Sequence, residues 1–404
     1  MMSNNKIGIL LISNGIGGAE KRFKNYFNYM NKKYKGKVYF IVNQTLYELL
    51  LMNNLIQEIN DIIVLDEPKC IRKFFIYSKY KFSFISKIFT LIQRFNIALK
   101  ITNVIRLNDI DIVHGILDGI RYLPLISKSI PKTSVVASVV YPELSFLKKR
   151  QLVRGVAICN AVDCLNQTIY DTVISIKGVL KSNVSITSNS FTDYTKCKPS
   201  KIREMNVVFC ARLESMKNPF LFIDMAELIG STITGKLVRY TIIGNGTLSA
   251  EVHEKAKKLR DKGFNLKCLG FISNPSTILN KALVFVQPTK SESHATQSLL
   301  EAMGCGCAVV STNLPGIECV IPPNTGFLCD LDARAFAEKV SFLLNNYETA
   351  TRMGQMGKKH VEEHFSINTF AEYLLNLYKG CQKVNKIQSS YINKLFEFIK
   401  TCIL

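Results

Sequence analysis

The stretch Val207-Val-Phe-Cys-Ala-Arg-Leu-Glu-Ser-Met-Lys-Asn218 decides the fold, because a short apolar run passes directly into a loop that carries two cations. A short apolar run bounded by turn signals is typical of a strand buried in a parallel sheet. Such sheets bind their ligands beyond the carboxyl ends of the strands, which is where Arg212 and Lys217 stand. Their charges and hydrogen-bond donors suit the oxygens of a diphosphate.

A second stretch, Ser291-Glu-Ser-His-Ala-Thr-Gln-Ser-Leu-Leu-Glu-Ala-Met-Gly-Cys-Gly306, predicts a polar loop that enters a helix over Gln297–Gly304. Anions bind to the backbone N–H groups at a helix start. The candidate groups here belong to Thr296, Gln297, Ser298 and Leu299. Glu301, inside the helix, is a candidate to accept hydrogen bonds from two neighbouring ribose hydroxyls. Together the two stretches suggest a site for a nucleotide-diphosphate sugar.

Short apolar runs alternate with helical patterns along both halves of the chain, which predicts α/β domains with parallel sheets. The strands expected in the first half are Ile7–Ile12, Val38–Val42, Ile62–Leu65, Asp111–His114, Ser134–Val140, Gly155–Cys159, Ala161–Cys164 and one beginning at Val184. Those of the second half are Met205–Cys210, Arg239–Ile243, Leu266–Leu269, Ala282–Gln287 and Ala308–Ser311. We therefore expect two Rossmann-like domains that face each other across a cleft.

The expected domain boundaries follow from the composition. Residues 1–192 form the first domain, and the polar, lysine-rich segment 193–204 is the expected linker. Residues 205–360 form the second domain, in which Pro322–Phe327 is expected to be a turn. Residues 361–404 are expected to supply C-terminal helices and a tail.

The chain resembles the retaining glycosyltransferases of family 4, which have the two-domain GT-B fold. The resemblance runs from Ile7 to about Gly380 and is carried by six pieces in the expected order. They are Gly17-Gly-Ala-Glu20, Ala211-Arg-Leu-Glu-Ser-Met-Lys217, Tyr240-Thr-Ile-Ile-Gly-Asn-Gly246, Val284-Phe-Val-Gln-Pro-Thr289, Leu299-Leu-Glu-Ala-Met303 and Ala308-Val-Val-Ser-Thr312. The resemblance implies that Arg212 and Lys217 stabilise the leaving diphosphate and that Glu301 binds the ribose. It also implies that the C-terminal helices of 361–404 cross back to the first domain.

The family pattern also has a glutamate eight residues before the one at Glu301. In this chain that position is Ser293, whereas Glu292 lies one residue further away. Either Glu292 fills the role, or Ser293 or His294 contacts the donor sugar instead. The sequence leaves these alternatives open, and with them the identity of the sugar.

Two glycine pairs and one histidine complete the candidate site. Gly17 and Gly18 follow the first predicted strand, and Gly244 and Gly246 follow a later one. Glycine lets the backbone approach a ligand closely, but it also serves in an ordinary tight turn. His114 ends a predicted strand and resembles a family motif with a catalytic histidine. A buried structural histidine is the alternative interpretation.

The net charge of +21 is concentrated in part between Glu67 and Asp109, where nine basic residues occur without an acid. Aromatic residues are interleaved with these bases, which suits an anionic membrane surface. We therefore predict that 69–106 binds the inner face of the cell membrane, and that the protein is cytoplasmic and peripheral. A solvated basic helix is an alternative. No nucleic-acid motif accompanies the charge, so we expect no nucleic-acid partner.

The twelve cysteines show no paired spacing of the kind that binds zinc, and no secretory signal is evident. We expect reduced thiols and no metal site. Asp109-Ile-Asp111 and Asp330-Leu-Asp332 do not fall at carboxyl ends of predicted strands, so metal-independent chemistry is expected. No cofactor is expected beyond the nucleotide of the donor, UDP or GDP.

The favoured hypothesis is a glycosyltransferase of the hexosyl or N-acetylhexosaminyl class. Its expected acceptor is a glycan, linked to a lipid, in the synthesis of surface polysaccharide, lipopolysaccharide or O-antigen. One alternative is a GT-B protein that binds carbohydrate or a partner enzyme without turnover. The other is a nucleotide-sugar epimerase.

Overall fold

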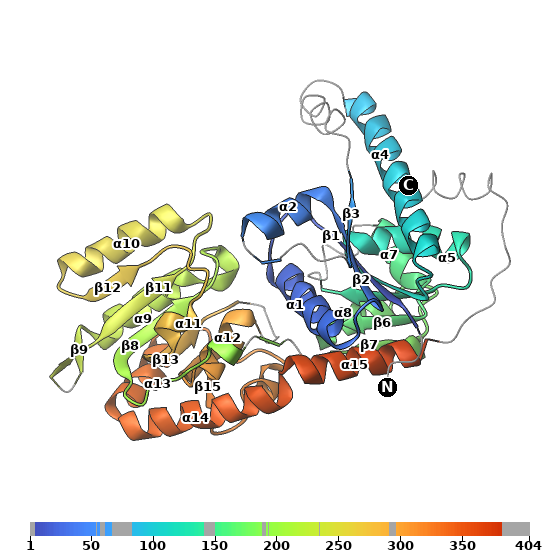
Figure 1. The fold of residues 1–404 in the computed structure, drawn as a ribbon. Coiled ribbons are helices and arrows are strands. Elements are labelled where there is room, and N and C mark those ends of the chain that lie inside the picture. The colour runs from blue at the N-terminus through green and yellow to red at the C-terminus, as the bar shows by residue number, and fades with distance from the viewer. Residues whose placement is uncertain are drawn as a thin grey trace. The chain divides into compact units, whose positions relative to one another are not determined.

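The computed structural model describes residues 5–53, 55–56, 61–66, 83–140, 150–187, 191–192, 194–233, 235–290 and 296–381. The chain forms two compact units. The first consists of Met1–Thr187 and Ala371–Leu404, and the second of Ser188–Phe370 (Figure 1). Within the described residues, no helix combines the length and the apolar character that a membrane span requires.

The first unit contains a parallel sheet of seven strands in the order β3-β2-β1-β4-β5-β6-β7. Its strands are β1 Ile7–Ile12, β2 Val38–Asn43, β3 Ile62–Leu65, β4 Ile112–Leu117, β5 Ser134–Val139, β6 Ala161–Cys164 and β7 Val184–Ile186. Every residue of β1 is buried, because helices cover both faces of a parallel sheet. The helical segments are α1 Gly18–Lys33, α2 Gln44–Met52, α4 Ser83–Leu107, η1 Asp118–Tyr122, α5 Leu123–Ser129, α7 Arg150–Ala157, α8 Gln167–Ile174, η2 Lys181–Asn183 and α15 Ile367–Lys379.

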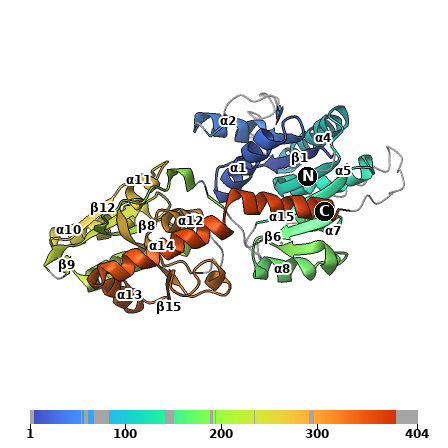
Figure 2. The same ribbon diagram turned by 60° about the horizontal axis from the view of Figure 1, so that its bottom comes forward.

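In Figure 2, α15 lies beside α1 and over the strands of the first unit. Although α15 is the last described helix, most of it belongs to this unit. Its buried residues Ala371, Leu374 and Tyr378 recur at three- and four-residue spacing, so one stripe of the helix faces the unit.

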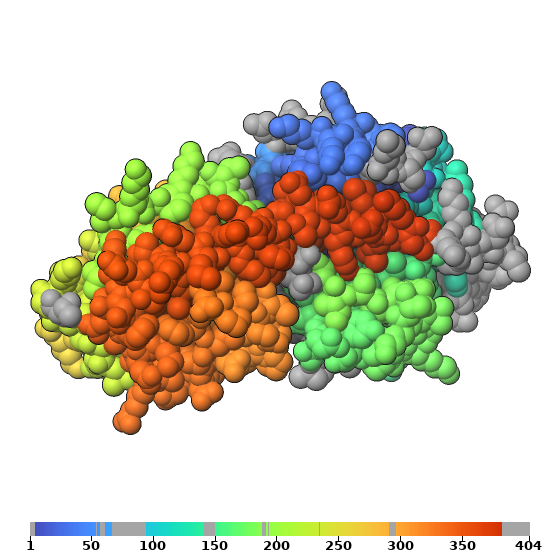
Figure 3. All heavy atoms as spheres, turned by 90° about the horizontal axis from the view of Figure 1, so that it is seen from below, coloured from blue at the N-terminus to red at the C-terminus, as the bar shows by residue number. Residues whose placement is uncertain are grey.

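The second unit contains a parallel sheet of six strands in the order β12-β11-β8-β13-β14-β15. They are β8 Glu204–Cys210, β11 Arg239–Ile243, β12 Asn265–Cys268, β13 Ala282–Gln287, β14 Ala308–Thr312 and β15 Gly326–Cys329, and a two-stranded ribbon is formed by β9 Thr232–Ile233 and β10 Lys236–Leu237. The helical segments are η3 Tyr194–Lys196, η4 Ser215–Lys217, α9 Pro219–Ile229, α10 Ser249–Asp261, α11 Ser276–Leu279, α12 Gln297–Gly304, η5 Ile317–Cys319, α13 Ala333–Asn345 and α14 Tyr347–His364. Figure 3 shows α14 lying along the surface of this unit.

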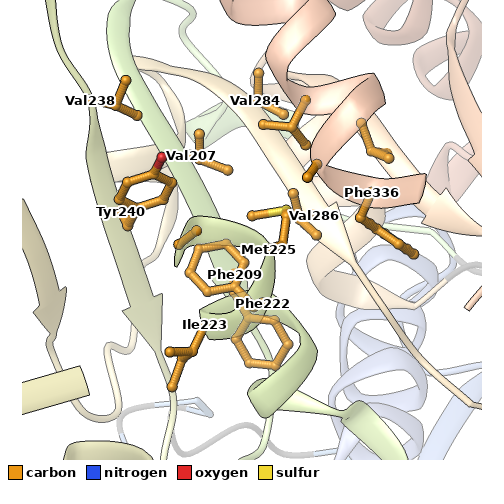
Figure 4. Close-up of a cluster of buried hydrophobic side chains, with 14 of the residues drawn as sticks. Val207, Phe209, Phe222, Ile223, Met225, Val238, Tyr240, Val284, Val286 and Phe336 are labelled. Atoms are coloured by element: carbon orange, nitrogen blue, oxygen red, sulfur yellow. The ribbon is translucent and has the colours of Figure 1, made fainter. Parts of the chain in front are cut away.

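The core of the second unit lies between its sheet and helices α9 and α13 (Figure 4). Phe209 of β8 packs against Phe222 of α9 with ring centroids 5.7 Å apart. Tyr240 of β11 is fully buried and meets Phe222 edge to face. Truncation of one such aromatic side chain to alanine costs about 3–5 kcal/mol of stability. This packing fixes the strand ends from which the site loops emerge.

The predicted α/β class is confirmed, with two parallel sheets that match most of the expected strands. The strand predicted over Gly155–Cys159 is wrong, because these residues continue and end helix α7. Leu152, Gly155 and Val156 are buried at helical spacing. A Cβ atom on Gly155 would lie 2.3 Å from the carbonyl oxygen of Ile120, so the glycine permits the helix to pack closely against η1.

Two segments differ from the sequence expectations. The turn expected over Pro322–Phe327 runs into the edge strand β15, which begins at Gly326. The polar segment 193–204 lies within the second unit and contains η3 and the start of β8. Its Arg203 is buried.

Candidate functional site

The site in the second unit lies at the point where the order of the sheet reverses. From β8 the chain continues to β11 and β12 on one side, whereas β13, β14 and β15 are added on the other. The connections therefore diverge between β8 and β13, which pair in parallel. In open α/β sheets such a divergence leaves a place for a ligand beyond the carboxyl ends of the two strands.

The loop after β8 carries the two predicted cations. The Arg212 side chain is 72% exposed, and its Nη1 donates to Glu214 Oε1 at 2.8 Å. Lys217 is half-buried and ends the short helix η4. Asn218 follows with φ 53°, a left-handed conformation that asparagine tolerates, and Pro219 then opens α9. This sharp turn ends the cationic loop and starts the helix.

The loop after β13 contacts the loop after β8. The backbone N–H of Lys290 donates to the carbonyl oxygen of Met216 at 3.0 Å. Thr289 Oγ1 donates to the same oxygen at 3.3 Å, and Lys290 Nζ donates to Ser215 Oγ at 3.4 Å. The structure therefore joins the loop of the first stretch to the residues that directly precede the second stretch. Lys290 adds a third cation that sequence reasoning missed, although it follows a predicted strand end.

Helix α12 begins at a well-defined cap. Thr296 Oγ1 accepts a hydrogen bond from the N–H of Leu299 at 3.3 Å and donates to Gln287 Oε1 at 2.8 Å. Because Gln287 ends β13, the start of the helix is tied to the end of that strand. Ser298 is half-buried near Thr296. Gln297 Nε2 donates to the carbonyl oxygen of Phe191 at 2.6 Å.

Leu299 and Glu301 differ in surroundings although both lie in α12. The Leu299 side chain is fully buried in the core. Glu301 is half-buried on the other side of the helix. Of the two, only the Glu301 side chain is polar and partly accessible, as the predicted ribose contact requires. That contact stays a prediction.

Gly244 and Gly246 are required by the chain's own backbone. A Cβ atom on Gly244 would lie 1.9 Å from the carbonyl oxygen of Ala211, and one on Gly246 would lie 2.4 Å from that of Leu213. The N–H of Leu213 also donates to the carbonyl oxygen of Asn245 at 3.0 Å. The two glycines therefore allow their loop to pack closely against the segment that carries Arg212.

Phe271 stands beside this glycine loop and was not predicted as a site residue. It follows β12 and is 63% exposed. The N–H of Gly244 donates to the carbonyl oxygen of Gly270 at 2.8 Å, which holds the two loops side by side. An exposed ring after a strand end offers a flat surface to a planar ligand. The signal in the sequence was an aromatic residue directly after a strand and a glycine.

In the first unit, Gly17 and Gly18 lie at the start of α1, and the carboxylate of Glu20 organises their loop. Glu20 Oε2 accepts from the N–H of Gly17 at 2.9 Å, and Oε1 accepts from Ser13 Oγ at 2.6 Å. The N–H of Ser13 in turn donates to Asn43 Oδ1 at 3.1 Å. A Cβ atom on Gly18 would meet no heavy atom within 4 Å. Among the residues that the structure describes, none requires glycine at this position through steric contact.

His114 is fully buried, and each of its ring nitrogens is hydrogen-bonded. Nδ1 lies 2.7 Å from the Tyr378 hydroxyl of α15, and Nε2 lies 2.8 Å from Ser138 Oγ. Ser138 donates its hydroxyl proton to Asp163 Oδ2 at 2.7 Å, so Nε2 carries the proton of the neutral ring and donates to Ser138. Nδ1 then accepts from Tyr378. This geometry describes a structural role, and the predicted catalytic role remains untested.

The buried polar network around His114 contains two further ionisable groups, Asp163 and Arg22. Tyr373 of α15 donates to Asp163 Oδ1 at 2.9 Å. Burial raises the pKa of the Asp163 carboxyl, whereas Arg22 and the hydrogen bonds oppose that shift. Burial, and secondly the charge of Arg22, lower the pKa of His114 to about 3. The network keeps the imidazole neutral, and its hydrogen bonds from Tyr373 and Tyr378 hold α15 against the sheet.

Several predicted features fall outside the described residues. Glu292, Ser293 and His294 are among them, as is the part of the basic stretch before Ser83. In its described part, three bases bond within the first unit. Arg94 Nη1 donates to Gln151, Lys100 Nζ to the carbonyl oxygen of Asp66, and Arg106 Nη2 to that of Ser129.

The two Asp-x-Asp matches have local structural partners. Asp111 Oδ2 accepts from the N–H of Lys6 at 3.0 Å. Asp332 is the N-cap of α13 and accepts from the N–H groups of Arg334 and Ala335. Within the described ranges, no group of three His, Cys, Asp or Glu side chains is placed to hold a metal ion.

Residues 196–360 match the family model described as glycosyl transferases group 1. The capsular polysaccharide biosynthesis glycosyltransferase CapM of Staphylococcus aureus is 30% identical over 146 residues, which cover 36% of this chain and 38% of CapM. This chain is thus aligned with about two fifths of CapM.

The chain is similar over more of its length to a Campylobacter jejuni enzyme, GalNAc-alpha-(1->4)-GalNAc-alpha-(1->3)-diNAcBac-PP-undecaprenol alpha-1,4-N-acetyl-D-galactosaminyltransferase. The two are 23% identical over 380 residues, which cover 92% of this chain and 98% of the enzyme. The crystal structure of Anabaena Alr3699/HepE in complex with UDP superposes with a TM-score of 0.70 at 16% identity and covers 93% of this chain and 99% of that one. Residues 196–360 are therefore similar to the group 1 glycosyltransferase domain, and the chain has the GT-B fold.

Proposed function

We propose that this chain is a retaining glycosyltransferase that moves a sugar from a nucleotide-diphosphate donor to a glycan acceptor. The observation that carries the proposal is the contact of Lys290 with Met216, because it joins the cationic loop after β8 to the loop that enters α12. Arg212, Lys217 and Lys290 then lie on two joined loops at the carboxyl ends of adjacent strands. That clustering of cations suits a diphosphate.

In the proposed reaction Arg212 and Lys217 bind the diphosphate, and Glu301 accepts hydrogen bonds from the ribose. The acceptor hydroxyl attacks the anomeric carbon on the face from which the diphosphate departs. The bond between that carbon and the diphosphate oxygen breaks, a bond to the acceptor oxygen forms, and the acceptor proton passes to the diphosphate. The cations stabilise the negative charge that develops on the leaving group. The exposed ring of Phe271 offers a stacking surface for the base of the nucleotide.

The acceptor proposed here is a lipid-linked glycan in the assembly of a bacterial surface polysaccharide or O-antigen. Two comparisons support this choice. CapM is named for capsular polysaccharide biosynthesis, and the name of the Campylobacter jejuni relative contains an undecaprenol-linked glycan. UDP or GDP is the nucleotide proposed, and UDP has the support of the Anabaena structure, which contains it.

The decisive experiment measures binding and slow hydrolysis of UDP-, GDP-, ADP- and dTDP-sugars by wild type and by Arg212→Ala/Lys217→Ala. We expect selective turnover of one donor and its loss in the double variant. Interconversion of free nucleotide sugars would instead favour an epimerase. A folded protein that neither binds nor hydrolyses any donor would favour a carbohydrate-binding protein without turnover.

Association with the inner face of the cell membrane through 69–106 is a separate part of the proposal. Its basis is the charge and aromatic content of that stretch. Flotation with vesicles of phosphatidylcholine, with and without phosphatidylserine, tests it. Binding should require the anionic lipid and weaken at high salt. Equal recovery with both vesicle types would contradict an electrostatic contact.

A further inference from the structure

Arg203 lies just before β8, in the segment where the sequence predicted a linker. The residue is only 6% exposed. Nη1 donates to the carbonyl oxygens of Leu279, Asn280 and Ala282 at 3.3, 3.2 and 3.1 Å. Nη2 donates to those of Cys305 and Gly306 at 2.6 and 2.8 Å. One buried guanidinium therefore gathers five backbone carbonyl groups.

These carbonyl groups belong to three elements. Leu279 and Asn280 end helix α11, and Ala282 is the first residue of β13. Cys305 and Gly306 directly follow helix α12. The last carbonyl groups of a helix have no partner within it and carry partial negative charge, which a guanidinium neutralises. Arg203 thus joins the end of α12 to the start of β13.

The surroundings of Arg203 are shaped around its side chain. Gly306 has φ 70°, and a Cβ atom there would lie 2.4 Å from Arg203 Nη2. Gly354 of α14 lets that helix approach the same segment, because a Cβ atom there would lie 2.0 Å from the carbonyl oxygen of Gly306. The Tyr347 hydroxyl accepts from the backbone N–H of Arg203 at 2.7 Å. The two glycines therefore leave room around the carbonyl groups that the guanidinium contacts, and the Tyr347 hydroxyl binds the Arg203 backbone.

Helix α12 is consequently held at both ends by the two ends of one strand. At its start, Thr296 donates to Gln287, the last residue of β13. At its end, Arg203 connects Cys305 to Ala282, the first residue of β13. A helix of eight residues is only about 12 Å long, so a shift at one end moves the whole helix.

We propose that Arg203 is a positioning residue for the donor site, because it sets the placement of α12 on β13 and thereby that of Glu301 and the helix N-terminus. This inference rests on the proposed function for the role of Glu301. The contacts of Arg203 with α12 do not depend on that role. Two measurements can therefore separate a failure of this inference from a failure of the proposed function.

The first measurement is hydrogen exchange of the backbone in Arg203→Met and Arg203→Lys. We expect at least tenfold faster exchange over Gln297–Gly304 in Arg203→Met and unchanged exchange over Ser249–Asp261. The lysine variant keeps one cationic donor, so its exchange should be intermediate. Arg239→Met is the matched control, since it removes an exposed pair with Glu204 on the same sheet. Unchanged protection of α12 in Arg203→Met would overturn the inference, whatever the donor.

The second measurement is the dissociation constant of UDP and of GDP by calorimetry, in a double-mutant cycle with Glu301→Gln. Arg203→Met should raise the dissociation constant of the nucleotide that wild type binds by tenfold or more. Arg203→Lys should recover part of this lost affinity. In the Glu301→Gln background, Arg203→Met should raise the dissociation constant by only about threefold or less. Fully additive losses would show that Arg203 does not act through Glu301. If wild type binds neither nucleotide, the proposed choice of UDP or GDP is wrong, and the exchange data alone decide whether Arg203 positions α12.

Discussion

The backbone N–H of Lys290 donates a 3.0 Å hydrogen bond to the carbonyl oxygen of Met216. This bond connects the two loops that follow adjacent strands of the second unit. A main-chain contact of this kind does not depend on side-chain rotamers, so the relative position of the loops is fixed before a ligand arrives. In the proposed site, Arg212 and Lys217 on one loop and the start of α12 beyond the other would then bind the same diphosphate.

Replacement of the two cations should reduce catalysis far more than stability. Arg212→Ala and Lys217→Ala are each expected to lower kcat/KM for donor hydrolysis by about 10²–10³-fold, because each removes a positive charge that stabilises the leaving diphosphate. Steady-state kinetics with the preferred nucleotide sugar would measure this effect. Lys258→Ala is the control, since Lys258 pairs with Glu254 on the exposed surface of α10. Wild-type activity in both site variants would exclude this part of the proposed site.

The glycine loop should tolerate no side chain at Gly246. Gly246→Ala places a methyl group 2.4 Å from the carbonyl oxygen of Leu213, so the loop or its neighbour must move. We expect a loss of about 2 kcal/mol or more in the free energy of unfolding. The comparison is Gly263→Ala, where φ is 89° but no heavy atom lies within 4 Å of the added Cβ. That variant should lose only about 1 kcal/mol from backbone strain. Equal losses in urea titrations of the two variants would refute the steric explanation.

Gly18 offers the opposite case, because a side chain there meets open space. Gly18→Ala should leave the unfolding free energy within about 0.5 kcal/mol of wild type. If substrate approaches the backbone of this loop, the methyl group should raise KM without affecting thermal stability. Kinetics and a melting curve on the same sample separate the two effects. Unchanged kinetics would mean that Gly17 and Gly18 form only a turn into α1.

His114 should make stability depend on pH in a defined window. Its pKa is lowered to about 3 in the folded state, whereas an unfolded histidine titrates near 6.5. The unfolded state then binds a proton that the folded state does not, so stability is complete above pH 6.5 and falls as the pH drops toward 3. When the pH is lowered from 7.5 to 5, protonation of this histidine in the unfolded state should reduce the free energy of unfolding by about 2 kcal/mol.

The raised pKa of Asp163 acts in the opposite direction, since its protonation favours the folded state as the pH falls. The contribution of His114 is therefore obtained by difference. Urea titrations at both pH values should show the loss in wild type and in the control His253→Asn, whose histidine is exposed, but not in His114→Asn. The same pH dependence in all three proteins would show that His114 does not cause it.

The strands and the cationic loop could be predicted because their signals are local. Buried parallel strands are continuous apolar runs, and Arg212 directly follows such a run. The error at Gly155 had a local cause as well, since a short apolar run does not distinguish a strand from a helix. Only the buried spacing of Leu152, Gly155 and Val156 reveals the helix.

The hydrogen-bond partners of His114 and Arg203 could not be predicted, because they are distant in the sequence. His114 bonds Tyr378, which lies 264 residues further along the chain. Arg203 bonds carbonyl groups that lie 76 to 103 residues away. A lysine-rich polar segment indicates a linker, and nothing within it shows that one arginine is buried. Long-range contacts of this kind are visible only in the folded structure.

The position of α15 has a consequence for synthesis of the chain. Tyr373 and Tyr378 bond to Asp163 and His114 in the first unit, but the ribosome makes them only after the whole second unit. While residues 188–370 are being synthesised, Asp163 and His114 lack these two tyrosine partners, and water takes the place of the hydroxyl groups. The native packing of the first unit therefore becomes complete only after α15 has been synthesised, although most of this unit precedes the second unit in the sequence.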